Sequence, residues 1–594
     1  MIVFNSRNER YKKPFGALRA GENLHLMMEC DEPFCEMRFV PAPDGGAERV
    51  YPMRPTDGGW EIDLTFEKAD LYFYRFEGVL ENGNHIFIGK GENSSAVVGD
   101  WLPRFSLTVY EADFTTPEKF RGGTMYQIFP DRFARVGRPQ QPARGQRFYH
   151  ENTDEPPFEY GRSDHPGGLD FYGGNLAGVA QKLPYLHDLG VTVIYFNPIF
   201  ESAENHRYST ADYLQPDPWF ATQPEFERFC RTAKEYGISV ILDGVFSHTG
   251  ADSVYFNKYG HYDSVGAYNS PQSPYYSWYE FESYPDRYAA WWGFENLPNV
   301  KETDPSYVQF ITGEDGVLAH WQKAGADGWR LDVADELPDT FLEALRRRVK
   351  QSDPEALIIG EVWENAVQKI SYGARRRFLL GRQCDSVMNY PWREAIIQLI
   401  RTGNVSAFAE SVQTLCEDYP PPVLDVLMNI LSTHDSVRII TALGCEQEVP
   451  NDEKGTFRLS EAALDTARFR LRLAAMLQFT LPGIPSIYYG DEIGMQGFAD
   501  PYNRAFYDEA HADGALRAFY GKLGEIRREH RDDFGKRIEF CQASEGVLHY
   551  RRGNVGIWMC FGTPHAAPSQ KSLLDVFDSS GRRVAVIYEQ IGKN

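Results

Sequence analysis

The chain has 594 residues, which predicts three or four domains at about 100–200 residues each. It carries 61 basic and 84 acidic residues, a net charge of −23. A surface of that charge repels phosphate backbones and anionic lipids, so neither a nucleic acid nor a membrane is expected as a partner. Hydrophobic residues make up 42% of the chain, enough for sizeable cores and too many for a disordered protein.

Cysteine usage and the lack of long apolar runs predict a cytoplasmic protein. Of the eight cysteines, only Cys30 and Cys35 lie close together, and no second close pair completes a zinc-type set. Reduced thiols in a reducing compartment are the simpler interpretation. Residues 1–20 carry charges throughout and lack the apolar core of a signal peptide. No run of about 18 apolar residues occurs, so no membrane span is predicted.

Residues 1–115 alternate apolar and polar positions in short runs. The runs are Leu24–Met28, Glu36–Val40, Trp60–Leu64, Leu71–Phe76 and His85–Ile88. Turn residues such as Asp57-Gly58-Gly59 and Asn82-Gly83-Asn84 separate them. Runs of period two at this spacing predict an antiparallel β-sandwich as the N-terminal domain.

From residue 116 to about 530, short apolar runs alternate with longer amphipathic stretches. The eight apolar runs are Thr124–Phe129, Val191–Phe196, Ser239–Phe246, Gly328–Val333, Leu357–Val362, Ser386–Tyr390, Met428–Leu431 and Ile484–Tyr489. Eight strand–helix units over about 400 residues are what a (β/α)8 TIM barrel requires. The predicted fold class is therefore α/β, with the barrel as the catalytic domain.

Two further segments complete the predicted architecture. Residues from about 249 to 303, after the third apolar run, are rich in Tyr, Trp, Ser, Asn and Pro. A structureless loop of that length is improbable, so we expect an inserted subdomain that roofs the barrel, although its aromatic rings could equally form its own core. Strand-like runs within residues 531–594 predict a small C-terminal β domain.

Charged residues occur at the ends of four of the eight apolar runs, where the chemistry of such barrels is located. They are Asp243, His248, Arg330, Asp332, Glu361, His434 and Asp435. Any one of them could be a helix cap or a structural group. As a set they differ, because burying several carboxylates at one mouth costs several kcal/mol unless cations and hydrogen bonds offset it. The natural reason to keep such a set is catalysis.

These segments resemble the α-amylase family of glycoside hydrolases. Four regions match in order, namely Asp243–His248, Gly328–Asp332, Glu361 and His434–Asp435, and further motifs extend from Tyr126–Phe133 to Tyr489–Glu492. Within the family the chain is most similar to the neopullulanase, cyclomaltodextrinase and maltogenic amylase group. The segments that carry this likeness are Phe171–Leu176, Asn197–Phe200, Asn205–Tyr208 and Glu361–Trp363. The N-terminal sandwich also fits that group.

The resemblance implies a retaining mechanism with three catalytic carboxylates. Asp332 would be the nucleophile that forms a covalent glycosyl intermediate. Glu361 would protonate the leaving oxygen and then activate water, with its pKa raised by the closed site and neighbouring carboxylates. Asp435 would bind the 2- and 3-hydroxyls and favour the distorted sugar ring. A nucleophile and an acid about 5–5.5 Å apart would retain the α configuration.

The resemblance also implies a set of substrate-binding residues around these carboxylates. Arg330 would keep Asp332 ionised and aligned, and Asp243 would support Arg330. His248 and His434 would donate to sugar hydroxyls, Tyr208 would stack on the same sugar beside His206, and Trp363 would form a platform for the leaving group. Asp500 and Arg504 would contact more distant glucose units. For Trp363, Asp500 and Arg504, ordinary loop packing is the alternative.

Two departures from the family pattern argue against a structural calcium, so no cofactor or metal is predicted. Ser247 stands where many α-amylases carry an asparagine that binds calcium. The loop Ala134–Pro139 carries arginines where calcium would need oxygen ligands, although Asp170 could serve a weaker site.

The sequence therefore predicts a retaining hydrolase of α-glucosidic bonds, mainly α-1,4, in maltooligosaccharides, cyclodextrins, pullulan or starch. The alternatives are an α-glucan transglycosylase and a catalytically silent glucan-binding homologue. The silent homologue would be expected to lose the carboxylates or to carry a membrane span, and this chain does neither. Relatives in the resembling group often dimerise, so a homodimer through residues 1–115 is a further expectation.

Overall fold

The computed structural model describes residues 1–139, 146–160 and 167–590. Contacts between Cα atoms divide the chain into two compact units. Unit 1 contains Met1–Thr116, Glu364–Ser386 and Ala409–Leu424, and unit 2 contains the rest. Within the described residues, no helix combines the length and the apolar character that crossing a bilayer requires.

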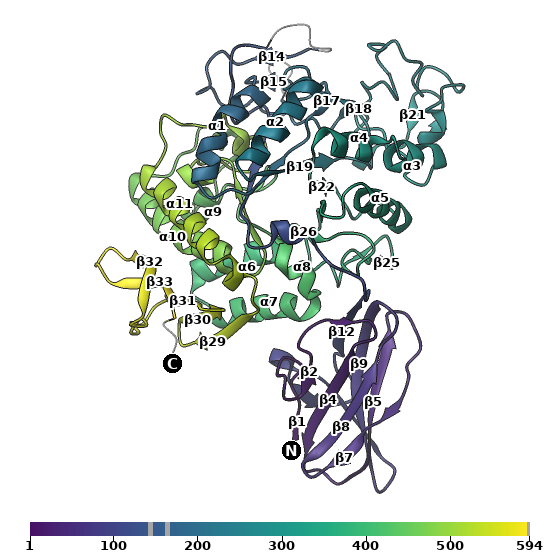
Figure 1. The fold of residues 1–594 in the computed structure, drawn as a ribbon, viewed down its shortest axis with the longest axis vertical. Helices are drawn as coiled ribbons and strands as arrows, with labels where there is room; N and C mark the ends of the chain where they lie inside the picture. Colours follow the sequence, from purple (N-terminus) through teal and green to yellow (C-terminus); the bar gives the residue numbers. More distant parts are fainter. Residues whose placement is uncertain (140–145, 161–166, 591–594) are drawn as a thin grey trace. The chain divides into compact units, whose positions relative to one another are not determined.

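Eight parallel strands form the central barrel (Figure 1). In chain order they are β13 (Met125–Ile128), β16 (Val193–Phe196), β19 (Ser239–Gly244), β22 (Gly328–Leu331), β23 (Leu357–Gly360), β26 (Ser386–Val387), β27 (Met428–Ile430) and β28 (Ile484–Tyr488). They pair in the order β26-β23-β22-β19-β16-β13-β28-β27, and a parallel bridge between Met388 and Met428 closes the ring. Each strand lies within one of the eight predicted runs, and the predicted TIM barrel is confirmed.

Helices follow the strands along the chain, and those of unit 2 cover the outside of the barrel. They are α1 (Leu176–Asp188), α2 (Gln223–Glu235), α3 (Pro305–Thr312), α4 (Val317–Ala324), α5 (Asp339–Ser352), α6 (Tyr390–Thr402), α7 (Val405–Asp418), α8 (Pro421–Val426), α9 (Ile439–Gly444), α10 (Glu461–Thr480), α11 (Gly514–Glu529) and α12 (Arg531–Phe534). Local sequence sets their starts. Asn175 caps α1 by accepting from Gly178 N at 2.9 Å, and Thr222 and Glu225 form a capping box at α2.

Unit 1 contains the predicted N-terminal sandwich. One sheet comprises β1 (Ile2–Val3), β2 (Lys12–Lys13), β4 (Asn23–Cys30), β7 (Arg54–Thr56) and β8 (Gly59–Thr65). The other comprises β3 (Leu18–Arg19), β5 (Phe34–Pro43), β6 (Tyr51–Pro52), β9 (Asp70–Leu80), β10 (His85–Lys90), β11 (Ala96–Val98) and β12 (Phe105–Tyr110). Alternate residues of both sheets meet in one core; Leu24, Leu26 and Met28 pack there with Phe39 and Phe76.

The insert and the C-terminal region follow the predicted layout. The insert holds little regular structure beyond β20 (Phe281–Ser283) and β21 (Arg287–Tyr288). Its Trp278 is buried against Tyr307 and Phe310, whereas Trp292 is 78% exposed, so the aromatic rings serve both as core and as surface. The C-terminal antiparallel sheet consists of β29 (Ile538–Ser544), β30 (Val547–Arg552), β31 (Val555–Cys560), β32 (Lys571–Phe577) and β33 (Arg583–Glu589).

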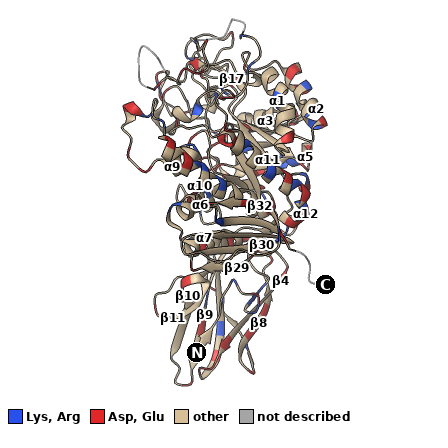
Figure 2. Ribbon diagram, turned by 90° about the vertical axis from the view of Figure 1, so that its left-hand side faces the viewer, with Lys and Arg blue, Asp and Glu red and all other residues tan. Residues whose placement is uncertain are grey.

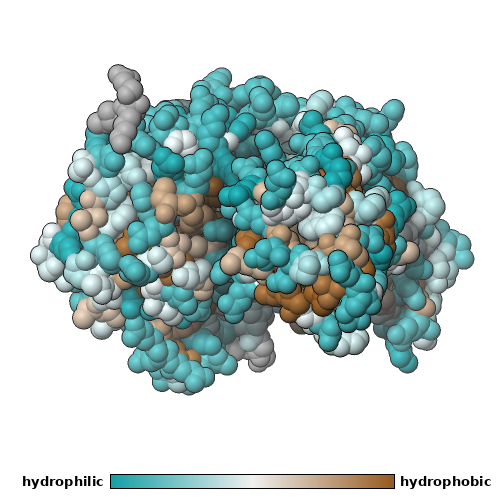
Figure 3. All heavy atoms as spheres, turned by 90° about the horizontal axis from the view of Figure 1, so that it is seen from below, coloured by the Kyte–Doolittle hydropathy of each residue, from teal (hydrophilic) through white to brown (hydrophobic). Residues whose placement is uncertain are grey.

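Four shorter two-stranded elements lie in loops. They are β14 (Phe148–Tyr149) with β15 (Asp170–Phe171), β17 (Phe200–Ser202) with β18 (Thr210–Pro216), β20 with β21, and β24 (Ile370–Ser371) with β25 (Ala374–Arg375). The face in Figure 3 is mainly hydrophilic and carries scattered hydrophobic patches, as is usual for a protein surface.

Candidate active site

Arg330 lies at the centre of the site, fully buried near the end of β22. Its Nη1 donates to Asp243 Oδ1 and to Asp332 Oδ1, each at 2.8 Å. Its Nη2 lies 2.8 Å from Glu361 Oε2. One guanidinium therefore holds three carboxylates from the ends of three neighbouring strands. This arrangement brings together the predicted nucleophile, the predicted acid and the predicted supporting aspartate.

Asp243 is held by neutral donors as well as by Arg330. Its Oδ2 accepts from the hydroxyl of Tyr195 at 2.6 Å and from that of Tyr208 at 3.0 Å. The carboxylate thus has no lone pair directed at an open cleft, and its residue is 1% exposed. Asp243 thus contacts Arg330 directly, and its role as a support for Arg330 stays a prediction.

The electrostatics of the mouth favour retention of protons on its carboxyl groups. Burial raises the pKa of Asp332, and the nearby charges of Glu361 and Asp243 raise it further, while the Arg330 guanidinium lowers it. Burial also raises the pKa of Asp435, opposed by the charges of Arg504 and Arg330. Burial likewise raises the pKa of Asp243, opposed by the charge of Arg330, so the three aspartates share a tendency to retain protons.

The backbone after Asp332 is strained in a way that aligns Glu361. Val333 has φ +41°, a left-handed conformation that β-branched residues rarely adopt. In this conformation its N–H donates to Glu361 Oε2 at 2.9 Å. The other carboxyl oxygen, Oε1, accepts from Trp363 Nε1 at 3.2 Å. Backbone strain at this turn thus fixes the position of the predicted acid relative to the predicted nucleophile.

Trp363 forms a half-exposed aromatic platform beside Glu361. Its ring stacks on Tyr390, with centroids 3.9 Å apart and planes 10° apart, and the residue is 49% exposed. The buried Tyr390 ring at the start of α6 supports the tryptophan from behind. The exposed indole face is suited to stacking against a sugar ring.

His434 lies in a chain of hydrogen bonds that sets its tautomer. Its Nδ1 faces Gln127 Nε2, a donor, at 3.1 Å, so Nε2 carries the proton. Nε2 lies 2.6 Å from the Tyr208 hydroxyl and 3.0 Å from Asp435 Oδ2. Burial lowers the pKa of His434 well below its usual value, and the charges of Arg504 and Arg330 lower it further. His434 is therefore neutral at pH 7.

Arg504 binds Asp435 directly, which the sequence reasoning did not predict. Its Nη2 lies 3.3 Å from Asp435 Oδ1, and its Nη1 lies 2.8 Å from Asp500 Oδ1. Its Nε donates to the backbone carbonyl of His434 at 3.0 Å. Burial raises the pKa of Asp500, and the Arg504 charge opposes this. Arg504 and Asp500 thus reach the carboxylate cluster itself.

His248 and His206 flank the same mouth. His248 is buried; its Nδ1 bonds to Ser247 Oγ at 3.0 Å, and its Nε2 has no hydrogen-bond partner within the described residues. Burial lowers the pKa of His248 to about 4. His206 accepts from Tyr208 N at 3.1 Å and lies 3.3 Å from Glu204. The free Nε2 of His248 is available to a ligand hydroxyl.

Several residues of the site were missed by the sequence reasoning. They are Gln127, Tyr195, Glu204, Glu336 and Tyr390. Glu336 accepts from the indole N–H groups of both Trp291 and Trp292, at 2.9 and 2.8 Å, and so ties the insert to the loop after Asp332. Trp291 in turn packs 5.4 Å from His248. The only signal in the sequence for Glu336 was its position, four residues after the predicted nucleophile Asp332.

The positions at which calcium was considered do not fit a calcium ion. Arg135 Nη1 donates to the carbonyl oxygens of His150 and Tyr172, which a cation would have to displace. The Asp170 carboxyl accepts from His150, Asn205 and the backbone of Phe158. No group of three or more His, Cys, Asp or Glu side chains within the described ranges could hold a metal ion.

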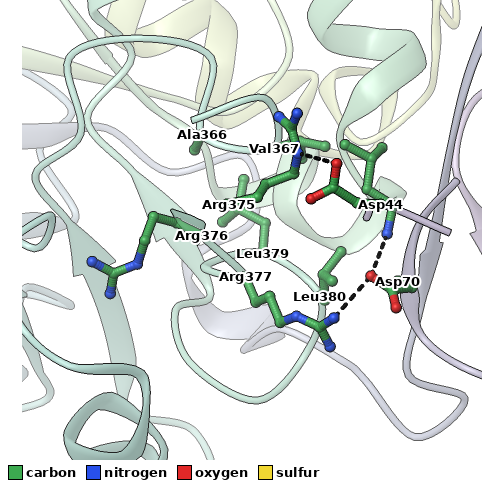
Figure 4. Close-up of a pocket in the computed structure, with 10 residues that line it drawn as sticks. Asp44, Asp70, Ala366, Val367, Arg375, Arg376, Arg377, Leu379 and Leu380 are labelled. Carbon is green, nitrogen blue, oxygen red and sulfur yellow. Dashed lines mark hydrogen bonds and ion pairs between the residues drawn. The ribbon is translucent and has the colours of Figure 1, made fainter. Parts of the chain in front are cut away.

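Two hollows outside the carboxylate cluster differ in what they could bind. One, in unit 1, measures about 50 Å³, room for roughly two waters, and its Arg375 and Arg377 pair with Asp44 and Asp70 (Figure 4). It is too small for a sugar. The other measures about 720 Å³ and is lined by aromatic residues that include Tyr502 and Phe506. None of the predicted site residues belongs to the lining of this hollow.

Comparisons with known proteins identify the family. Residues 127–539 match the model of the α-amylase catalytic domain. The chain therefore belongs to the α-amylase family of glycoside hydrolases.

Particular relatives agree with this assignment. The chain is 36% identical to neopullulanase 2 of Thermoactinomyces vulgaris over 516 residues, which cover 82% of this chain and 76% of that protein. It is 34% identical to an amylopullulanase of Thermoanaerobacterium saccharolyticum over 88% of this chain but spans only 44% of that protein. A type III pullulan hydrolase from Thermococcus kodakarensis shares the fold, with a TM-score of 0.69 at 24% identity, over 99% of this chain and all of that one.

Proposed function

We propose that this chain hydrolyses α-glucosidic bonds, mainly α-1,4, in short α-glucans, with retention of the anomeric configuration. The observation that carries this proposal is the single guanidinium of Arg330, which binds both Asp332 and Glu361 at 2.8 Å. Two carboxyl groups gathered on one cation suit attack and proton donation at one glycosidic bond. The names of the relatives support α-glucans as the substrate class.

The chemistry divides between Asp332 and Glu361. Asp332 attacks the anomeric carbon and forms a glycosyl ester, while Glu361 gives its proton to the departing glycosidic oxygen. Glu361 then takes a proton from water, the water oxygen attacks the same carbon, and the ester bond breaks. Arg330 holds the Asp332 oxygen that does not attack. Val333 N–H and Trp363 Nε1 keep Glu361 in position through both steps.

The sugar at the reacting bond is bound by the remaining polar groups. His248 Nε2, which is buried and without a partner in the described residues, hydrogen-bonds one of its hydroxyls. His434 bonds another when its Nε2–H turns to the sugar from Tyr208 and Asp435. Asp435, aligned by Arg504, binds two further hydroxyls. The Tyr208 ring, parallel to His434 within 13°, provides a stacking face. More distant glucose units extend toward Asp500, which pairs with Arg504.

Transfer of the glycosyl group to another sugar is the second candidate activity. The observation in its favour is the pair of exposed indoles, Trp363 on Tyr390 and Trp292 on Glu336. Such platforms can hold an acceptor sugar in place of water. The same covalent intermediate serves both outcomes, so the two activities differ only in what attacks it.

Initial rates on β-cyclodextrin, pullulan and soluble starch test the proposed function, with the Asp332→Asn protein as the blank. A clear rate on at least one glucan, with the α-anomer released first, supports it. A clear preference for the ring indicates a narrow cleft, and a preference for starch an open one. Activity on none of the three glucans, or first release of the β-anomer, refutes the proposal.

We also propose three features of the whole protein. Domain boundaries near residues 115 and 530, with an insert at about 249–303, agree with where the sandwich, barrel and C-terminal sheet lie in the chain. Cysteine usage in the sequence, where only Cys30 and Cys35 lie close together, supports a cytoplasmic location. The family resemblance supports a homodimer through residues 1–115. Light scattering tests the dimer, and a monomer across the working concentration range rejects it.

A further inference from the structure

A hollow of about 330 Å³ lies at the end of the barrel opposite the catalytic carboxylates. Its wall is formed by the residues at the N-terminal ends of β13, β16, β19 and β22 and by the last turns of α11. Asp327 at this end and Asp332 at the other are five residues apart along β22, so the hollow is about 15 Å from the nucleophile. It is separate from the site described above.

The charge of this hollow is opposite to that of the chain. Its lining contains five cationic side chains, namely Lys119, Lys234, Arg527, Arg528 and Arg531, and one anionic side chain, that of Asp327. The whole chain carries a net charge of −23. Five cations around one cavity repel one another, so this arrangement costs free energy unless an anion offsets it.

The protein supplies little of that compensation itself. Asp327 pairs with Lys119 at 2.8 Å, and Asp353 lies 3.7 Å from the same ammonium. The side chains of Lys234 and Arg528 are exposed and form no hydrogen bond or ion pair with any other described residue. Arg531 donates only to backbone carbonyls, those of Arg121, Glu118 and Lys119.

Arg527 is the clearest sign of missing negative charge. It is 1% exposed and donates to the carbonyl oxygens of Gly123, Phe479 and Gly483. These carbonyls satisfy its donors but do not neutralise its charge. Burial, together with the charge of Arg552, lowers the pKa of Arg527 to about 9. These carbonyls do not belong to α11, so Arg527 does not act as a cap of its own helix.

We propose that this hollow binds a phosphate-bearing anion. Guanidinium groups offer paired donors that match phosphate oxygens, and ammonium groups add charge. The hydroxyl groups of Thr124 and Ser239 in the same lining can donate to further phosphate oxygens. The volume and the net charge of the lining exceed what a single phosphoryl group requires, so a ligand with two phosphoryl groups binds more tightly than orthophosphate.

The site serves stability rather than the chemical step. Residues at the N-terminal ends of barrel strands are not in contact with the reacting bond. An anion that binds the folded state alone raises the temperature of unfolding increasingly as its concentration exceeds the dissociation constant. Bound phosphate therefore raises Tm without changing the rate of glucan cleavage.

Titration calorimetry and thermal unfolding in the presence of pyrophosphate test the proposal. Both are done without magnesium, and sodium chloride at matched ionic strength is the reference. We expect saturable binding and a rise in Tm of about 1–3 °C over the chloride reference. The double substitution Lys234→Gln with Arg528→Gln removes two exposed cations that have no described partner. It should weaken pyrophosphate binding at least tenfold and leave cleavage of maltooligosaccharides within about twofold.

A matched control removes two cations elsewhere. Lys323→Gln with Arg287→Gln gives the same change in net charge outside the hollow, and both side chains are exposed. This variant should bind pyrophosphate as the unmodified protein does. Equal binding of orthophosphate and pyrophosphate would support the phosphate site and assign it to one phosphoryl group. No saturable binding, or equal weakening in both variants, overturns the proposal.

Discussion

The two ends of the barrel carry opposite excesses of charge. At the C-terminal end, four carboxyl groups share two guanidiniums and are buried in a dense hydrogen-bond network. At the N-terminal end, five cations surround one carboxylate in an open hollow. Elsewhere acidic and basic residues are interspersed along the outer helices (Figure 2).

The difference indicates what each end requires. A reacting centre needs charge that is buried, fixed and partly uncompensated, because such groups react or bind in the transition state. The free energy that this buried charge costs is offset by stabilising interactions elsewhere in the fold. An exposed cationic hollow can instead exchange ligands at equilibrium and respond to them through stability. Substitutions at the mouth should therefore change activity more than stability, and substitutions at the hollow should do the reverse.

The largest expected effect is that of Asp332→Asn at the mouth. Loss of the nucleophile removes the covalent route, and we expect kcat to fall by at least about 10³-fold. Tm should stay the same or rise, because the substitution removes a buried group whose pKa is raised by burial and by two neighbouring carboxylates. Steady-state rates on a maltooligosaccharide and a thermal melt measure both.

A matched control for that substitution is Asp327→Asn, at the other end of the same strand. It removes a partner of Lys119 and leaves the hollow more cationic. Its kcat should remain within about twofold, while its Tm falls in chloride and recovers in pyrophosphate. Similar losses of activity for both aspartates would contradict the division between the two ends.

The second effect, Glu361→Gln, distinguishes the acid from the nucleophile. We expect a loss of about 10²–10⁴-fold on maltooligosaccharides, whose leaving alcohol needs a proton. An aryl α-glucoside with an acidic phenol needs none in the first step, so its glycosylation rate should fall by much less. Single-turnover measurement of phenol release separates the two cases. An equal loss on both substrates would argue against Glu361 as the proton donor.

Most of the fold could be predicted from sequence because each element has a strong local pattern. The β-rich runs from residues 124–129 to 484–489 are short, apolar and regularly spaced, and each one contains a barrel strand. The insert was harder, because its contacts are between aromatic rings rather than along a periodic element. Trp278 and Trp292 lie in equally aromatic stretches of sequence, yet Trp278 is buried in the core and Trp292 is exposed at the surface.

Site residues within a recognisable sequence motif could be predicted. Residues that reach the site through contacts between distant segments of the chain could not. Asp332, Glu361 and Asp435 lie in recognisable segments. Gln127 sets the tautomer of His434 across 307 residues of sequence, and Tyr390 supports Trp363 from the start of the next helix. The pairing of Arg504 with Asp435 likewise depends on how two loops meet. The cationic hollow draws its residues from five separate segments, so no local pattern reveals it.

A smaller effect is expected at the indole platforms. Glu336→Gln keeps the shape of the side chain but weakens its hydrogen bonds to Trp291 and Trp292, since the acceptor loses its charge. We expect hydrolysis to change by less than about fivefold and the share of transfer products at high maltooligosaccharide concentration to fall. Product ratios by chromatography measure this. Glu282→Gln, an exposed glutamate of the same insert, serves as the control.

The smallest expected effect is on the pH dependence of stability, and it separates the two ends of the barrel further. His248 has a pKa lowered to about 4 by burial, against about 6.5 when unfolded. Between these values the unfolded chain binds a proton that the folded chain does not, so stability rises with pH and is lost as pH falls from 6.5 to 4. In His248→Gln this loss, about 2 kcal/mol at pH 5, should be absent.

The comparison of His248→Gln with the unmodified protein isolates this one group, because the buried carboxyl groups titrate in both. The measurement is the difference in unfolding free energy between the two proteins at pH 5 and at pH 7. In the control, the exposed His511 is replaced by Gln. The unfolding free energy of this variant should differ from that of the unmodified protein by the same amount at pH 5 and at pH 7. The cations of the hollow stay charged throughout this range, since the pKa of Arg527 is lowered only to about 9. Acid thus destabilises the mouth while the hollow keeps its affinity for anions. A His248→Gln protein that loses as much stability as the unmodified protein between pH 7 and pH 5 would refute that separation.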